Sequence, residues 1–336
     1  MTIKVGINGF GRIGRLVFRI AEADPNIEVV AINNPSDLEC AAYLAKYDSC
    51  HGIAFNEARA EEGALIFDGH RIHAFQDRDP KNLTWGDYGV DVVLETTGKL
   101  KTSEACQPHI DNGAKKVVIS APGKDVDNTI VMGVNHNTYD AATQHIVSNA
   151  SCTTNCLAPF AKVLNDKFGI EKGFINTVHA YTNDQKILDV HHKDFRRSRA
   201  AAVSQIPTTT GAAKAVGLVI PELQGKLDGM ATRVPVPTGS MVDLTCELGC
   251  EVTAEQINSA MEEAANGELK GILQYCTDPI VSCDVIGNPY SSIFDAGLTN
   301  VLGGKGNFIK CISWYDNEWG YSQRVVDLAK YMMDQA

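Results

Sequence analysis

The chain of 336 residues lacks an excess of positive charge: 30 Lys and Arg residues stand against 41 Asp and Glu residues, and the net charge is -11. Nucleic-acid phosphates are bound mainly by Lys and Arg, so this balance argues against a nucleic-acid partner. No apolar run approaches the ~20 residues of a transmembrane helix. A strand pattern begins at Ile3, which leaves no room for a signal peptide. We therefore expect a cytoplasmic protein without a membrane partner.

Closely paired cysteines are missing as well. The ten cysteines form no Cys-x-x-Cys motif and no Cys/His set with zinc-like spacing, so we expect no metal site. Unpaired cysteines in a chain of this length are typical of a reducing compartment. The composition, 44% hydrophobic and 21% charged, is that of an ordinary globular protein. The length predicts about two domains.

The N-terminal residues predict a nucleotide-binding turn. Residues 2–8 have the pattern of a strand, residues 9–14 match Gly-x-Gly-x-x-Gly through Gly9, Gly11 and Gly14, and residues 15–23 have helical apolar spacing. In this order the glycines permit a tight turn and a close approach of the backbone to a pyrophosphate at the helix N-terminus. The spacing therefore predicts the first βαβ unit of a dinucleotide-binding domain.

Two later apolar stretches, 91–98 and 115–122, look like buried parallel strands that run into polar ends. Ligands of open α/β sheets bind beyond the carboxyl ends of the strands. The candidates to line such a crevice, with ordinary turn roles as the alternative, are Thr96, Gly98, Ser120 and Ala121.

The second strand, 27–32, ends in Asn33-Asn34-Pro35. NAD-binding folds normally place Asp or Glu near this point to bind the ribose 2′-hydroxyl. Asn34 can still form a hydrogen bond with a ribose, but it lacks the charge that repels the 2′-phosphate of NADP. A turn residue before proline is the alternative role.

The run from Ser148 to Cys156 predicts a reactive thiol. Cys152 follows a short apolar strand and precedes a helical pattern, so it is expected at a helix N-terminus, where unpaired N–H groups and the helix dipole lower a thiol pKa below ~8.5. His179 lies downstream as a possible base. Free cysteines are more often buried as small apolar residues. The polar neighbours of Cys152 favour the reactive interpretation.

The second half of the chain predicts a different domain. Longer alternating strands at 174–181 and 240–248, with a helix at 255–265, are typical of an antiparallel sheet covered on one side. We expect an α/β protein in which a Rossmann-type dinucleotide-binding domain is joined to an α+β catalytic domain with a mainly antiparallel sheet. The boundaries predicted are 1–150, with a C-terminal helix at about 317–336, for the first domain and 151–316 for the second.

Two clusters in this half suit anions. Residues 207–214 offer hydroxyl and backbone N–H groups at a helix start, and Arg233 places a guanidinium on an expected strand. A helix cap and a surface ion pair are the respective alternatives. The basic loop 182–206 is predicted to make subunit contacts or to attract anions.

These motifs together resemble the phosphorylating glyceraldehyde-3-phosphate dehydrogenase family of the bacterial glycolytic type. The resemblance extends from Val5–Arg15, through the highly specific run Ala150–Pro159, to Trp314–Ser322. It implies oxidation of glyceraldehyde 3-phosphate, with inorganic phosphate, to 1,3-bisphosphoglycerate through a cysteine thioester and reduction of NAD. It also implies a homotetramer.

The resemblance assigns roles to individual residues. It implies that Cys152 is the nucleophile and His179 its base. The attacking phosphate is assigned to Ser151, Thr153, Thr210 and Gly211, and the substrate C3 phosphate to Thr182 and Arg233. The cofactor is assigned to Arg12, Ile13, Arg78, Ser120 and Asn317, and the amide of Asn317 is expected to meet the nicotinamide carboxamide.

The chain departs from the family at two places. Asn34 stands where the NAD-type members carry Asp, and Val190-His191 stands where Leu-Pro is common. Both changes leave NADP possible, and NAD is favoured because Pro35 offers no donor for a 2′-phosphate. Erythrose-4-phosphate dehydrogenase is the related alternative. A thiol acyltransferase or hydrolase and a non-catalytic nucleotide sensor are the alternatives from other classes.

Overall fold

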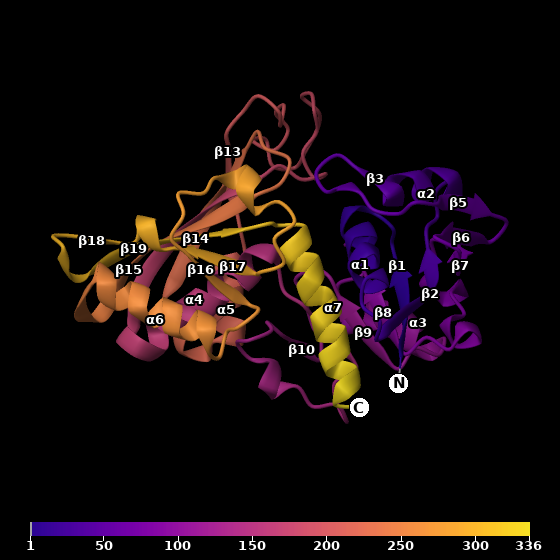
Figure 1. The fold of residues 1–336 in the computed structure, drawn as a ribbon, viewed down its shortest axis with the longest axis horizontal. Coiled ribbons are helices and arrows are strands. Elements are labelled where there is room, and N and C mark those ends of the chain that lie inside the picture. Colours follow the sequence, from indigo (N-terminus) through magenta and orange to yellow (C-terminus); the bar gives the residue numbers. More distant parts are fainter. Residues whose placement is uncertain (1) are drawn as a thin grey trace. The chain divides into compact units, whose positions relative to one another are not determined.

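The computed structural model describes residues 2–336, which divide into two compact units. The first unit contains the residues up to Ile130, His136–Ser151 and Ser322–Ala336. The second contains Val131–Asn135 and Cys152–Tyr321. In Figure 1 the first unit is drawn mainly in indigo and purple, with the end of the chain in yellow. The boundary between Ser151 and Cys152 falls within the motif that is predicted to carry a reactive thiol.

The first unit is built on a nine-stranded sheet with the order β10-β11-β9-β8-β1-β2-β7-β6-β5. Its strands are β1 (Ile3–Asn8), β2 (Ile27–Asn33), β5 (Ala58–Glu61), β6 (Ala64–Phe67), β7 (His70–Phe75), β8 (Val92–Glu95), β9 (Lys116–Ile119), β10 (Asn128–Thr129) and β11 (Ile146–Ser148). The strands from β10 to β7 are parallel to one another, and β6 and β5 add an antiparallel edge. A separate pair joins β3 (Tyr47–Asp48) to β4 (Gly52–Ile53).

Helices connect these parallel strands. They are α1 (Arg12–Glu22), α2 (Leu38–Lys46) and α3 (Ser103–Asp111), with short 3-10 helices at Pro80–Asn82, Trp85–Tyr88 and His136–Thr138. The apolar stripe of α1, including Leu16, Val17 and Ile20, is buried, as its helical spacing predicts. The predicted strand-turn-helix order around the glycines is present.

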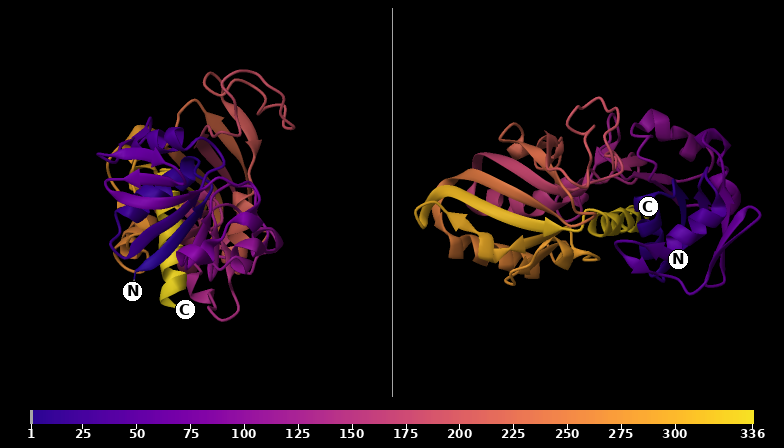
Figure 2. Two further views of the ribbon diagram at one scale, coloured as in Figure 1. Left: turned by 90° about the vertical axis from the view of Figure 1, so that its right-hand side faces the viewer. Right: turned by 90° about the horizontal axis from the view of Figure 1, so that it is seen from above.

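The second unit contains an eight-stranded sheet with the order β13-β14-β12-β15-β19-β17-β16, in which β18 also pairs with β19. Its strands are β12 (Ile170–Ala180), β13 (Ile206–Thr209), β14 (Leu227–Val234), β15 (Ser240–Thr253), β16 (Leu273–Cys276), β17 (Ser292–Asp295), β18 (Asn300–Val301) and β19 (Lys305–Tyr315). Only the pairs β12–β14 and β16–β17 are parallel. Figure 2 shows β19 (yellow) beside β15 (orange).

Helices cover one face of this sheet. They are α4 (Cys152–Phe168), α5 (Ala212–Val219) and α6 (Ala254–Asn266), with 3-10 helices at Pro221–Leu223, Ser282–Val285 and Ala296–Leu298. Along β12 the burial alternates, so Ile175, Thr177 and His179 are buried whereas Phe174 is exposed. The predicted fold class, a Rossmann-type domain with an α+β domain of mainly antiparallel sheet, is confirmed.

The last helix, α7 (Trp319–Asp334), carries the chain back into the first unit from Ser322 onward. There Lys330 forms an ion pair with Asp24, and the ring of Tyr331 packs against His136 and Tyr139. None of the helices within residues 2–336 has the length and hydropathy of a membrane span.

Candidate active site

The glycine turn of the first unit forms an open cradle. Gly9 has a φ of 94°, which an L side chain rarely adopts, and a Cβ on Gly14 would come within 2.1 Å of the carbonyl oxygen of Gly9. A Cβ on Gly11, by contrast, would meet nothing within 4 Å. Gly11 caps α1 without a side-chain hydrogen bond, so the helix N-terminus adjoins the space beside Gly11. This arrangement suits a pyrophosphate.

A pocket of about 280 Å³ adjoins the turn. Four residues predicted to contact the cofactor line it: Gly9, Gly11, Arg78 and Thr96. Pro35 also lines the pocket, as do residues for which the sequence predicted no role: Asn8, Asn33, Ser36, Asp77, Pro80, Thr97, Lys99 and Leu100. Most of them follow the carboxyl ends of parallel strands, and this rule could have identified them.

Three further residues predicted to contact the cofactor do not line this pocket: Ile13, Asn34 and Ser120. Asn34 uses its Nδ2 group within its own turn, at 3.4 Å from the carbonyl oxygen of Ser36. Ser120 follows β9, and its N–H donates to the carbonyl of Glu95. Ile13 lies in the first turn of α1. Asn34 therefore has the local role of a turn residue in this structure.

Arg12, another predicted cofactor contact, pairs with Asp48. The guanidinium donates two hydrogen bonds to this carboxylate, with NH1 at 2.5 Å. Burial alone would raise the pKa of Asp48, but hydrogen bonds from His51, Arg12 and the N–H of Cys50 hold that pKa well below its usual value. The side chain of Arg12 is thus fixed at the helix start by an ionised partner.

Beneath the pocket lies a buried polar network that the sequence analysis missed. Nδ2 of Asn8 donates to Glu95, and Nδ2 of Asn33 donates to Oδ1 of Asn8 at 2.7 Å. Nε1 of Trp85 donates to Nδ1 of His109, whose Nε2 lies 3.2 Å from Glu95. The network ties together the ends of β1, β2 and β8, and so it supports the floor of the pocket.

Cys152 is the first residue of α4, directly after a sharp turn. The preceding β11 ends at Ser148, and Ala150 has a φ of 54°, which is uncommon for a residue with a side chain. As a residue Cys152 is partly exposed, and its sulfur lies 3.5 Å from Nε2 of His179 on β12. The strand-to-helix junction places the thiol at the positive end of a helix.

The imidazole of His179 is held from its other side. Nδ1 lies 2.7 Å from the carbonyl oxygen of Ala180, and NH1 of Arg233 donates to the same oxygen at 2.9 Å. Arg233 lies on β14 directly opposite His179 in the parallel register. Two neighbouring strands therefore bring the thiol, the imidazole and the guanidinium together.

The pKa values differ from the expectation for the thiol. Burial raises the pKa of Cys152, and the positive charge of Arg233 only partly opposes this. Burial, followed by the charge of Arg233, lowers the pKa of His179 to about 3. The prediction of a lowered thiol pKa is therefore wrong for this structure, because desolvation outweighs the helix N-terminus. The raised pKa of Cys152 and the lowered pKa of His179 both favour a neutral thiol beside a neutral imidazole.

Hydroxyl groups surround the start of α4. The hydroxyl of Tyr315 lies 2.9 Å from Oγ1 of Thr153 and 2.9 Å from Oγ1 of Thr177, and it is buried. Ser151 precedes the helix and is partly exposed. Tyr315 was not identified from the sequence, because it is distant from Thr153 along the chain.

The remaining anion candidates are arranged along β13. Gly211 caps α5, and Oγ1 of Thr210 accepts from the N–H of Ala212 at 3.2 Å. The register sets Ile206 opposite Arg233 and Thr209 opposite Met230. Thr210 and Gly211 therefore lie further along β14 from Arg233, so the two candidate clusters are separate.

Arg197, from the basic loop, joins this region. Its Nε donates to Oγ1 of Thr208 at 2.8 Å, and its NH2 donates to the carbonyl of Thr209. Its charge also contributes to the low pKa of His179. Thr182 lies at the beginning of the same loop, where its carbonyl accepts from the N–H of Gln185. The sequence predicted Arg197 as part of the basic cluster of this loop, but not its contacts with Thr208 and Thr209.

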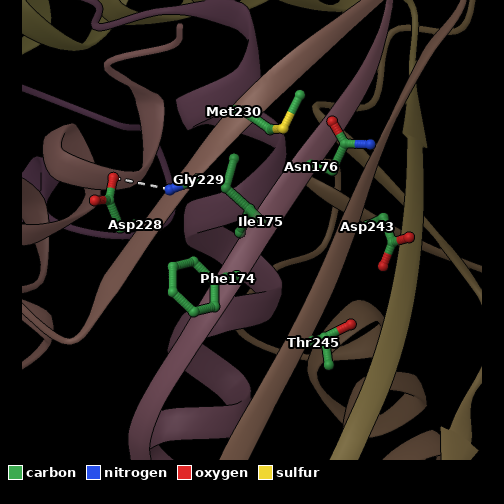
Figure 3. Close-up of a pocket in the computed structure, with 8 residues that line it drawn as sticks. All are labelled: Phe174, Ile175, Asn176, Asp228, Gly229, Met230, Asp243 and Thr245. Atoms are coloured by element: carbon green, nitrogen blue, oxygen red, sulfur yellow. Dashed lines mark hydrogen bonds between the residues drawn. The ribbon is translucent and has the colours of Figure 1, made fainter. Parts of the chain in front are cut away.

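A further pocket of about 440 Å³ lies on the second unit, lined by β12, β14 and β15. Figure 3 shows Phe174, Asn176, Met230, Asp243 and Thr245 around it. Along β12, Phe174 and Asn176 alternate with Thr177 and His179, so this pocket lies on the sheet face opposite the imidazole. It is therefore not part of the thiol site.

The two units define a dinucleotide-dependent oxidoreductase that carries a cysteine beside a histidine. Residues 3–103 match the model described as glyceraldehyde 3-phosphate dehydrogenase, NAD binding domain, and residues 151–317 match the corresponding C-terminal domain. The chain is 58% identical over 332 residues to glyceraldehyde-3-phosphate dehydrogenase of Geobacillus stearothermophilus, covering 99% of this chain and 98% of the relative. It is equally identical, with the same coverage, to glyceraldehyde-3-phosphate dehydrogenase 1 of Bacillus subtilis.

A third relative, from Streptomyces coelicolor, is 56% identical over 337 residues and the full length of both chains. The chain belongs to the glyceraldehyde-3-phosphate dehydrogenase family, and it is an NAD-dependent oxidoreductase of glycolysis. The predictions of the family, the activity and NAD as the cofactor are confirmed.

Proposed function

We propose that Cys152 is the nucleophile and His179 the base in the oxidation of glyceraldehyde 3-phosphate to 1,3-bisphosphoglycerate. The observation that carries this proposal is the distance of 3.5 Å between Sγ of Cys152 and Nε2 of His179 at the start of α4. Nδ1 faces both the carbonyl of Ala180 and NH1 of Arg233. With its proton on Nδ1, the imidazole donates to that carbonyl, accepts nothing from Arg233 and leaves Nε2 as an acceptor. This tautomer can take the thiol proton.

Because Cys152 and His179 are both neutral before the reaction, the first step must combine proton transfer with attack on the aldehyde. When the sulfur attacks the aldehyde carbon, its proton passes to Nε2, so the nucleophile forms as it is used and needs no permanent thiolate. The N–H of Cys152 at the helix start and the protonated imidazole can stabilise the substrate oxygen. NAD, when bound, supplies the hydride acceptor. The acyl group remains on Cys152 as a thioester.

Phosphate then releases the product. We assign the attacking phosphate to Ser151, Thr153, Thr210 and Gly211, and the substrate C3 phosphate to Thr182 and Arg233. The separation of the two clusters along β14 supports two phosphate positions. We add Arg197 as a further cation of this region, because it donates to Thr208 and Thr209 of β13.

For the cofactor, the open space at Gly11 and the uncapped start of α1 fit a pyrophosphate. We assign cofactor binding to the predicted residues: Gly9, Gly11, Arg12, Ile13, Gly14, Asn34, Arg78, Ser120 and Asn317. Use of NADP is the alternative that Asn34 leaves open. The proposed domains are 1–150 with the C-terminal helix for the cofactor, and 151–316 for catalysis.

Replacement of the thiol tests the catalytic assignment. Cys152→Ala should abolish aldehyde-dependent formation of reduced cofactor, because no thioester can form, while the dissociation constant of NAD stays within about 3-fold of wild type. Cys156→Ala, which removes a buried cysteine one helical turn away, is the matched control and should keep most of the activity. Substantial turnover by Cys152→Ala would overturn the assignment.

We also propose that the protein is a homotetramer of the cytoplasm. The loop 182–206 exposes large apolar side chains, among them Phe195 at 84% and Ile187 at 79%, and the open face of the second unit exposes Phe174. Contacts with further copies would remove these groups from water. Light scattering of the purified protein gives its mass directly, and a monomer would contradict this proposal.

A further inference from the structure

The amide oxygen of Asn317 is already bound within its own unit. Ser240 donates to Oδ1 of Asn317 at 2.8 Å, and Oγ1 of Thr238 lies 3.4 Å from the same oxygen. Asn317 is 5% exposed, and among residues 2–336 its Nδ2 group donates to no partner. The group that remains for a ligand is therefore a hydrogen-bond donor.

The direction of the bond from Ser240 follows from the backbone. The N–H of Ala180 donates to Oγ of Ser240 at 3.1 Å, and a backbone N–H can only donate. The serine proton is therefore free to be donated, and Oδ1 of Asn317 is its acceptor. Ser240 is 1% exposed, so water does not replace this acceptor.

Thr238 has a different principal partner. Its hydroxyl donates to Oδ1 of Asp316 at 2.8 Å, and the carboxylate of Asp316 also accepts from the N–H groups of Gly287, Glu318 and Trp319. Its contact with Asn317 is longer by comparison. Because a hydroxyl has only one proton, Ser240 is the hydroxyl that donates to the amide of Asn317.

We propose that Ser240 is a positioning residue that fixes the amide of Asn317 with Nδ2 as the group presented to the cofactor. The site then selects an acceptor on the nicotinamide substituent, the carbonyl oxygen, over the amino group. This inference rests on the proposed contact between Asn317 and the carboxamide. Ser240 also bonds the peptide of Ala180, whose carbonyl holds His179, so one hydroxyl connects the cofactor contact to the catalytic base.

Binding measurements with three probes test the proposal. The probes are NAD, its 3-acetylpyridine analogue, which keeps the carbonyl oxygen but has no amino group, and ADP-ribose, which has no nicotinamide. Calorimetric titration would compare wild type with Ser240→Ala and Ser240→Thr. Ser292→Ala is the control, because it removes a buried hydroxyl that bonds Ser313 on the same sheet.

In Ser240→Ala the amide of Asn317 can rotate. NAD can then pair its amino group with Oδ1 and should lose only about 2-fold in affinity, whereas the analogue, which can only accept, should lose about 10-fold, as expected for one hydrogen bond. Ser240→Thr keeps a hydroxyl and should restore the wild-type ratio of the affinities for NAD and its analogue. ADP-ribose affinity should be unchanged in each variant, as should all three affinities in Ser292→Ala.

Equal losses for NAD and its analogue, or no loss, would overturn the role of Ser240. The role of Ser240 is also overturned if Ser240→Thr loses as much affinity for the analogue as Ser240→Ala does while both variants bind ADP-ribose like wild type. Asn317→Asp, which removes the donor, separates this outcome from failure of the proposed contact. If that variant binds both dinucleotides like wild type, the assignment of Asn317 itself is wrong.

Discussion

Arg233 and His179 are direct partners in the register of β14 and β12, and NH1 of Arg233 lies 2.7 Å from Nδ1 of His179. A fixed positive charge at this distance disfavours protonation of the imidazole and favours ionisation of the nearby thiol of Cys152. One guanidinium therefore lowers the pKa values of both groups. It acts together with burial on the histidine and against burial on the cysteine.

Removal of this charge should raise the pKa of the thiol. In Arg233→Gln the rate of alkylation of Cys152 by iodoacetamide should reach its midpoint at a higher pH than in wild type, because only the thiolate reacts. Arg199→Gln, which removes an exposed arginine paired with Asp189, should leave the midpoint in place. A midpoint that moves to lower pH would contradict the electrostatic assignment.

His179 should also make stability depend on pH. The unfolded chain takes up a proton on this histidine below its ordinary pKa of 6.5, whereas the folded chain does so only near pH 3. The free energy of unfolding should therefore fall as the pH is lowered from 6.5 toward 3, by about 2 kcal/mol from this group at pH 5.

Denaturant unfolding at pH 7 and pH 5 measures this effect. His179→Gln should lose less stability between the two pH values than wild type. His191→Gln, at an exposed position, serves as the control. If His179→Gln and wild type lose the same amount, the histidine is not buried in its neutral form.

The hydroxyl of Tyr315 should support phosphate binding. Tyr315→Phe keeps the ring but leaves Thr153 and Thr177 without their shared partner, which should reduce stability by about 1–2 kcal/mol. The KM for inorganic phosphate should rise more than that for NAD, because Thr153 is assigned to the phosphate. Tyr275→Phe on the same sheet is the control, and steady-state kinetics with each substrate varied in turn is the measurement. Equal changes in both KM values would argue for a purely structural role.

Asn34 should determine how strongly the enzyme discriminates between NAD and NADP. Asn34→Asp introduces a carboxylate that repels the 2′-phosphate of NADP, so kcat/KM with NADP should fall about 10-fold while the value with NAD changes less than about 3-fold. Asn34→Ser adds no charge and should leave the ratio near that of wild type. An unchanged ratio in Asn34→Asp would show that the ribose lies elsewhere.

Two glycines of the cradle should respond differently to the same methyl group. Gly14→Ala should destabilise the fold, because its Cβ would lie 2.1 Å from the carbonyl of Gly9. Gly11→Ala should keep the wild-type melting temperature within a few degrees but weaken NAD binding, because the methyl group enters the space left for the pyrophosphate. Thermal unfolding with NAD titration separates the two effects. Tight NAD binding by Gly11→Ala would contradict the proposed cradle.

Local patterns predicted much of the fold. The order of strand, glycine turn and helix at the N-terminus, and the alternation along residues 174–180, depend on neighbouring residues only. The position of Cys152 at a helix start also follows from residues close to it in the sequence. For Asn34 the structure shows a contact within its own turn, and a contact with the ribose stays a prediction.

The sequence by itself determined the dinucleotide-binding turn, the two kinds of sheet and the cysteine at a helix N-terminus, because each is encoded by the spacing of residues close together in the chain. Only the tertiary structure decided that Arg233 lies opposite His179, that Tyr315 joins Thr153 to Thr177, and that Ser240 bonds Asn317. These pairs are distant in sequence, and strand register brings them together. Only the tertiary structure decided that the pKa of the Cys152 thiol is raised, because desolvation depends on every group packed around the sulfur.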